Sequence, residues 1–130
     1  MLGLAVALLP HQATAQSPAS RVVVDSEARH FRLVLSGLAR TEPINHLHGF
    51  DLFLTDSSNR PVVGASISLS GERLYSPNPL PTAPQVQPGA APGAYRVEGL
   101  RFHMGGRWRL VFAIELAHIR DRAIVELEAE

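Results

Sequence analysis

Two histidines separated by one residue, His46 and His48, are the first side chains in this sequence whose type and spacing suggest chemistry. Alternate residues of a β-strand point to the same side, so both imidazoles could bind one copper or zinc ion. A site with only two histidine ligands holds a metal weakly. The alternative interpretation is that both rings are solvated where a loop enters a strand.

A second pair, His103 and Met104, offers an imidazole nitrogen beside a soft thioether, a combination that suits Cu(I). Adjacent residues of a strand face opposite sides, so the two side chains cannot easily bind the same ion. Methionine also fills irregular gaps in protein cores. We therefore expect Met104 to pack in the core, and we retain it as a copper ligand, with His46 and His48, only for an alternative function.

Motifs of catalysis are absent from the sequence, which has no Gly-x-Ser-x-Gly, no His-Glu-x-x-His and no phosphate- or dinucleotide-binding glycine loop. The absence of cysteine excludes disulfides, thiolate catalysis and cysteine-based metal sites. Twelve basic residues balance twelve acidic ones, so no net charge attracts nucleic acid or an anionic membrane. We predict a protein that is not an enzyme, needs no cofactor and binds no nucleic acid. An enzyme without a recognisable motif is the least favoured alternative.

The elements that must position these residues show a hydrophobic period of two, which indicates strands with one buried face. Turns are expected at residues 56–59 and at Arg120-Asp121. Six or seven such strands, with no convincing helix, predict an all-β, immunoglobulin-like antiparallel β-sandwich, with a barrel as the alternative. The predicted inward residues are Phe31, Leu33, Leu35, Phe50, Leu52, Leu54, Ala65, Ile67, Leu69, Tyr95, Val97, Trp108, Leu110, Phe112, Ile114, Leu116, Ala123, Val125 and Leu127.

The first sixteen residues resemble a secretory signal peptide. They contain an apolar run at 2–9, a helix-breaking Pro10 and the small-residue triplet Ala13-Thr14-Ala15. The apolar run is far shorter than the roughly 20 residues that span a bilayer. An N-terminal strand or buried helix is the alternative. We therefore predict a periplasmic or secreted protein without a transmembrane segment after cleavage, organised as a signal peptide (1–15), a flexible lead-in or edge strand (16–29) and one β-sandwich domain (30–130).

The segment 71–93 contains six prolines and three glycines. This density disfavours both helices and ladder pairing, so we expect a long ordered loop. Loops held by a rigid sandwich are common recognition surfaces. The sequence therefore predicts a binding or accessory domain that contacts a partner protein or small ligand through loop 71–93. Copper handling through His46, His48 and Met104 is the alternative function.

The pattern of glycine, aromatic and aliphatic residues over 31–129 resembles the YtkA-like family. The resemblance implies an exported, immunoglobulin-like sandwich domain. The motifs that carry it are Leu47-His48, Pro61-Val62-x-Gly64-Ala65, Leu80-Pro81-Thr82-x-Pro84, Gly93-x-Tyr95-x-Val97 and Leu100-x-Phe102-x-Met104-x-Gly106-x-Trp108-x-Leu110.

One part of the family pattern is missing from this chain. Relatives of this type often carry Gly-Gly-Met-Pro-x-His-x-His-Gly just before the Leu-Pro-Thr-x-Pro segment, a cluster suited to copper. Here Arg73 takes the methionine position, and Ser76 and Asn78 take the two histidine positions. A guanidinium repels a cation, and neither a hydroxyl nor an amide replaces imidazole for a soft metal. The resemblance therefore carries over the fold, the export and His48, but not the copper cluster.

Overall fold

The computed structural model describes residues 20–130, so the predicted signal peptide lies outside the described residues. This part of the chain forms nine strands, and no helix in it could span a membrane. The predicted all-β class is confirmed. The count exceeds six or seven because β3 and β6 are too short to show hydrophobic alternation. The strands are β1 (Arg21–Asp25), β2 (Phe31–Ser36), β3 (Thr41–Glu42), β4 (His48–Asp56), β5 (Ser66–Arg73), β6 (Gln85–Pro88), β7 (Ala94–Leu100), β8 (Gly106–Leu116) and β9 (Ile119–Ala129).

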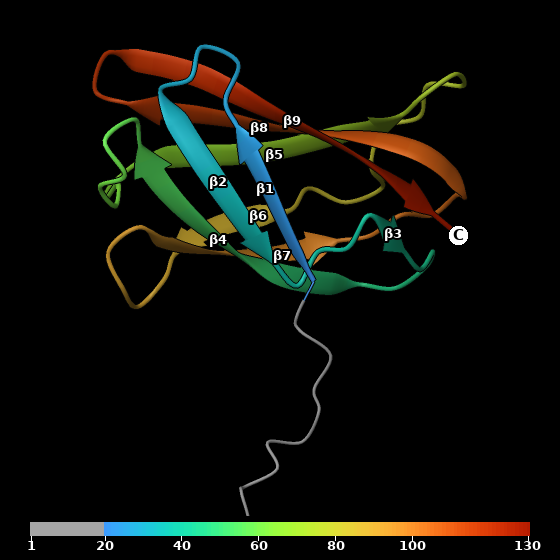
Figure 1. The fold of residues 1–130 in the computed structure, drawn as a ribbon. Coiled ribbons are helices and arrows are strands. Elements are labelled where there is room, and N and C mark those ends of the chain that lie inside the picture. The colour runs from blue at the N-terminus through green and yellow to red at the C-terminus, as the bar shows by residue number, and fades with distance from the viewer. Residues whose placement is uncertain (1–19) are drawn as a thin grey trace, which may run out of the picture.

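Two sheets face each other as the layers of a sandwich (Figure 1). One sheet has the strand order β1-β2-β4-β7-β6, and the other has the order β3-β9-β8-β5. Neighbouring strands are antiparallel except for the two-residue β3, which runs parallel to β9. The architecture is therefore the predicted two-layer sandwich rather than a barrel, because each sheet keeps two edges.

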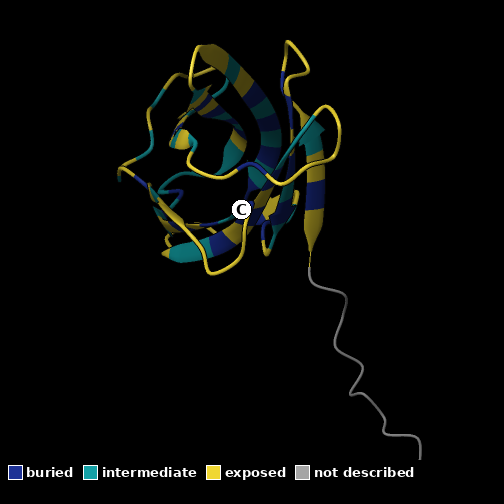
Figure 2. Ribbon diagram, turned by 90° about the vertical axis from the view of Figure 1, so that its left-hand side faces the viewer, coloured by how far each residue is buried: buried dark blue, intermediate teal, exposed yellow. Residues whose placement is uncertain are grey.

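The core lies between the sheets and consists of inward residues of the strands together with Leu38, Val62 and Phe102 from the connections. Buried and exposed bands alternate along the strands, as Figure 2 shows. Trp108 is fully buried, and its ring packs against Phe102 with the ring centroids 5.2 Å apart. Its indole Nε1 donates a hydrogen bond to the carbonyl of Met104 at 3.0 Å. Burial of side chains of this size stabilises the fold by about 2–3 kcal/mol each.

Two local predictions were wrong. The turn between β8 and β9 lies at Ala117-His118 rather than at Arg120-Asp121, because Leu116 already pairs with Ile119. The proline-rich segment 71–93 is also not one loop.

The segment 71–93 is divided between the two ends of the sandwich. Its first residues complete β5, and residues 85–88 form β6, which pairs with β7. Pro88 is tolerated because β6 is an edge strand, where a missing N–H need not break a ladder. The remainder is an arm, residues 74–84, at one end of the sandwich and a turn, residues 89–93, at the other.

Asp121 at the start of β9 joins the two sheets. Its carboxylate accepts hydrogen bonds from the Ser26 hydroxyl at 2.6 Å and from the backbone N–H groups of Ala28, His30 and Arg122 at 3.0, 3.2 and 2.8 Å. Burial raises the pKa of Asp121, but these four hydrogen bonds lower it more, to about 2. The turn between β1 and β2 is thereby attached to the opposite sheet.

This depressed pKa predicts a pH-dependent loss of stability. The group stabilises the fold fully above its unfolded pKa, near 4, and this contribution disappears as the pH falls toward 2. After discounting for solvent screening, we expect Asp121→Asn to lower the free energy of unfolding by about 1–2 kcal/mol at pH 7 and by almost nothing near pH 2. Urea denaturation at both pH values measures this difference.

The matched control is Asp51→Asn, which removes an exposed carboxylate paired with Arg96 on the outer sheet face. It should change the free energy of unfolding by less than about 0.5 kcal/mol at pH 7. If Asp121→Asn lowered the free energy of unfolding equally at both pH values, the role assigned to the charge of Asp121 would be contradicted.

Candidate functional site

Three connections lie at the end of the sandwich that contains β3, and we call them together the loop end. They are the loop 43–47 between β3 and β4, the segment 101–105 between β7 and β8, and the arm 74–84 between β5 and β6. Figure 1 shows them around the C-terminus, on the right of the view. The loop end contains or adjoins every residue that the sequence analysis proposed as a ligand.

The loop 43–47 is attached to the segment 101–105. The Asn45 backbone N–H donates to the Phe102 carbonyl at 2.6 Å, and the Asn45 side-chain oxygen accepts from Arg101 at 3.2 Å. Asn45 has a φ of 57°, a left-handed conformation that asparagine tolerates better than most residues. These bonds hold the loop in one position.

The arm is attached to the same segment from the other side. Arg73 Nε donates to the Gly105 carbonyl at 2.8 Å, and the Leu74 N–H donates to the Arg107 carbonyl at 2.8 Å. Gly106 has a φ of 126°, and a Cβ there would lie 3.0 Å from Arg73 Nε. A glycine is therefore needed at 106 so that the guanidinium can reach its carbonyl.

The arm begins as a hairpin that continues from β5. The Arg73 N–H donates to the Asn78 carbonyl at 2.9 Å, and the Leu80 N–H donates to the Gly71 carbonyl at 3.1 Å. Leu80 packs against the core. The base of the arm is thus held by backbone bonds and by apolar burial, so its tip projects from a rigid support.

Tyr75 occupies the tip of the arm, and 92% of its surface is exposed. It has a φ of 67°, the left-handed region, which costs an ordinary residue about 1–2 kcal/mol. Its neighbours Ser76 and Pro77 are also exposed. An aromatic side chain held in the solvent at this cost is the feature of the loop end that the core does not explain.

His48 lies at the beginning of β4 and faces Glu42 of β3. The His48 Nδ1 lies 3.1 Å from the carbonyl oxygen of His46. The His48 Nε2 lies 3.5 Å from Glu42 Oε1 and is buried without a hydrogen-bond partner in the described residues. The rings of His46 and His48 lie 5.7 Å apart, so the structure brings this predicted pair together.

His103 and Met104 belong to the wall of the core. The His103 ring lies edge-on to Trp108 at 5.8 Å, and Met104 is partly buried against the core. The other histidines of the described chain, His30 and His118, are exposed. Within residues 20–130 no group of three or more His, Cys, Asp or Glu is arranged to hold a metal ion.

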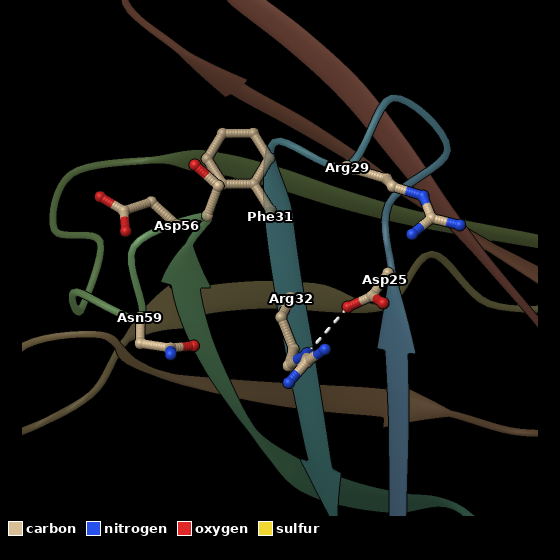
Figure 3. Close-up of a pocket in the computed structure, with 7 residues that line it drawn as sticks. Asp25, Arg29, Phe31, Arg32, Asp56 and Asn59 are labelled. Atoms are coloured by element: carbon tan, nitrogen blue, oxygen red, sulfur yellow. Dashed lines mark hydrogen bonds and ion pairs between the residues drawn. The ribbon is translucent and has the colours of Figure 1, made fainter.

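The opposite end of the sandwich has an open hollow of about 280 Å³ (Figure 3). Its carboxylates have structural partners. Asp25 pairs with Arg32 at 2.8 Å, and Asp56 Oδ1 accepts the N–H groups of Ser58 and Arg60 at 2.8 and 3.0 Å. These backbone bonds lower the pKa of Asp56, and the hydrogen bond from Arg32 lowers that of Asp25. Both carboxylates therefore stay ionised at neutral pH as parts of turns and ladders.

The fold and the loop end define the class of protein: a β-sandwich domain with a braced set of loops at one end. No protein-family model matches the chain, and no curated protein matches it, so the YtkA-like relationship stays a prediction.

The solved structures that are similar to the chain include the following two. One is the C-terminal domain of ZirS, with 12% identity and a TM-score of 0.46, covering 100% of this chain and 82% of that chain. The other is PcoC, a methionine-rich copper-resistance protein from Escherichia coli, with 14% identity and a TM-score of 0.45, covering 86% of this chain and all of that chain. The function of this chain is therefore argued below from its own residues.

The sequence analysis missed Glu42 and Tyr75. Glu42 precedes His48 by only six residues, but the two-residue strand β3 shows no period, and its pairing with β9 of the other sheet fixes where Glu42 lies. Tyr75 did leave a signal. It is an aromatic residue in a stretch of serine, proline and asparagine, where no core can form around it.

The bracing of the arm leads to a testable expectation. Replacing Arg73 with alanine removes the bond to Gly105 and should make the Leu74 amide exchange about fivefold faster, which corresponds to about 1 kcal/mol. Hydrogen exchange followed by NMR measures this rate. Arg120→Ala, which removes an exposed arginine paired with Glu115, is the matched control and should leave the rate unchanged. Equal rates in both variants would show that Arg73 does not brace the arm.

Proposed function

We propose that the chain is an exported, non-catalytic binding or accessory domain whose arm, residues 74–84 of the predicted loop 71–93, contacts a partner. The observation that carries this proposal is Tyr75, which is exposed and held in a left-handed conformation at the tip of the braced arm. Backbone strain of this kind persists only where the surroundings impose it, and it concentrates in binding segments. The export part of the proposal rests on the apolar N-terminal sequence.

The chemistry of the arm suits recognition of a protein surface. Tyrosine gives a large contact area with little loss of side-chain entropy, and the neighbouring serine and asparagine offer adaptable hydrogen bonds. The bracing by Arg73 and Leu74 reduces the entropy that binding would otherwise cost. We expect the partner to present a concave, partly apolar pocket for the Tyr75 ring.

Further apolar residues accompany the arm at the loop end. Leu47 is 65% exposed and Ile44 is 38% exposed, both in the loop 43–47. With Tyr75 they make up three of the seven large hydrophobic side chains that are exposed in the described residues. Ile44 and Leu47 therefore add exposed apolar surface to the same end of the sandwich as Tyr75.

Four carboxylates of the described chain have partners within the fold. The carboxylates whose pKa is lowered, Asp25, Asp56, Asp121 and Glu126, all accept hydrogen bonds that stabilise strands or turns. These four carboxylates are therefore assigned to the fold, and the proposed function does not use them.

Copper handling is a second candidate function, and one observation favours it. The buried, unpaired Nε2 of His48 and the carboxylate of Glu42 offer a nitrogen and an oxygen to one cation, with His46 adjacent. These donors suit Cu(II) better than Cu(I). Met104 would add a soft sulfur ligand only if its side chain left the core, against which it packs.

The first prediction from the main proposal concerns Tyr75. A photo-crosslinking amino acid at position 75 should give a discrete adduct with exported proteins of the source cells, whereas the same group at Val63, which is 66% exposed at the other end, should not. With the captured protein purified, Tyr75→Ala should weaken binding at least about 30-fold, as for an aromatic hot spot. Equal adducts at both positions, or unchanged affinity, would refute the proposal. We test the arm by substitution and not by deleting residues 75–90, because that deletion would also remove β6.

A separate prediction tests copper. Calorimetric titration with Cu(II) should give a dissociation constant below about 10 µM, and His48→Ala should weaken the binding at least tenfold. His118→Ala removes an exposed histidine at the opposite end and should leave the affinity unchanged. A dissociation constant above about 10 µM, or an affinity that His48→Ala leaves unchanged, would rule copper handling out.

A further inference from the structure

β1 is the outermost strand of the five-stranded sheet and has an unpaired edge. In the β1–β2 ladder, the Gly37 N–H donates to the Ser20 carbonyl and the Ser26 N–H donates to the Phe31 carbonyl. The backbone groups of even-numbered residues therefore face β2, because the pattern alternates along an antiparallel strand. Those of Arg21, Val23 and Asp25 consequently point away from the sheet.

The sequence of this edge is complementary to itself. β1 reads Arg-Val-Val-Val-Asp, with a positive charge at its beginning, a negative charge at its end and three valines between. When two such strands pair antiparallel about Val23, each Arg21 lies opposite the Asp25 of the other copy. Val23, whose backbone groups are available, lies opposite itself and can form two hydrogen bonds across the two-fold axis.

The two charges remain available for this pairing. Arg21 forms no ion pair with any residue between 20 and 130. Asp25 uses one oxygen, Oδ1, to accept from Arg32 at 2.8 Å, and Figure 3 shows the carboxylate at the end of β1 beside that arginine. The Oδ2 atom is left for an arginine from the other copy. The hydrogen bond from Arg32 also lowers the pKa of Asp25, so the carboxylate is charged at neutral pH.

An apolar row on the outer face of the same sheet ends at this edge. The strand register aligns Val23 with Val34, Val34 with Phe53 and Phe53 with Ala94. Val23 is 49% exposed and Phe53 is 38% exposed. Pairing through β1 would continue the row into the second copy, where the two Val23 side chains would cover each other.

We propose that two copies of this chain associate through antiparallel pairing of β1 with β1, which joins their five-stranded sheets into one. The centre of this edge, residues 22–24, has no charged residue, proline or bulge to oppose an added strand. A five-residue ladder buries less than the roughly 800 Å² per partner of a standard interface. The dimer is therefore concentration-dependent, with a dissociation constant between about 1 µM and 1 mM.

Charge reversal provides a specific test by sedimentation of the full chain. Arg21→Asp alone places like charges opposite each other and should weaken dimerisation at least about tenfold, and so should Asp25→Arg alone. In an equimolar mixture the two aspartates of one variant face the two arginines of the other, so a heterodimer should form as readily as the wild-type dimer. Arg60→Asp, at an exposed turn away from β1, is the control and should dimerise normally.

A cysteine at the two-fold axis gives a second readout that does not depend on altered charges. The natural sequence has no cysteine, so Val23→Cys introduces the only thiol. Paired residues of such a ladder have Cα atoms about 5.5 Å apart, within the range of a disulfide. Under mild oxidation Val23→Cys should cross-link at least about tenfold faster than the exposed control Val63→Cys.

Three outcomes would overturn the proposal. The first is a wild-type chain that remains monomeric up to about 1 mM. The second is a dimer that neither charge reversal weakens, which would place the interface elsewhere. The third is cross-linking at position 23 no faster than at position 63. Recovery of dimerisation only in the mixed charge variants would support it.

Discussion

The hydrogen bond from the Trp108 indole to the Met104 carbonyl connects the core of this sandwich to its loop end. The indole is fully buried, and a buried N–H needs an acceptor. Taking that acceptor from four residues earlier fixes the segment 101–105, which in turn binds the loop 43–47 through Asn45 and the arm through Arg73. The same packing that stabilises the fold therefore determines where the exposed Tyr75 is held.

The short elements of the fold mainly protect strand edges. β3 covers the end of β9, the base of the arm covers the end of β5, and β6 ends in a proline that cannot donate to an added strand. Within residues 20–130, no strand pairs with β1 along its outer side. Its five residues instead carry opposite charges at the two ends, which selects a single register for any strand that pairs with it.

Hydrophobic alternation was enough to predict the long strands, because each has one face on the core. The inward residues of β2, β4 and β8 are buried as expected, except Leu116 at the end of β8, which is partly buried. The short strands β3 and β6 could not be predicted this way, since two to four residues show no period and their pairing depends on distant segments. The turn at Ala117-His118 was missed because its φ of 54° falls on an alanine rather than on glycine or asparagine.

The candidate site was only partly accessible to sequence reasoning for the same reason. His46 and His48 are close in sequence and in space, but the carboxylate that faces His48 comes from another sheet.

The proposed binding through the arm and the proposed pairing through β1 also constrain each other. A two-fold axis through Val23 reverses the strand direction, so the arms of the two copies would lie at opposite ends of the joined sheet. Such a dimer could bridge two partners, but it could not bring both arms to one small surface, so its gain in avidity requires partners that are themselves clustered.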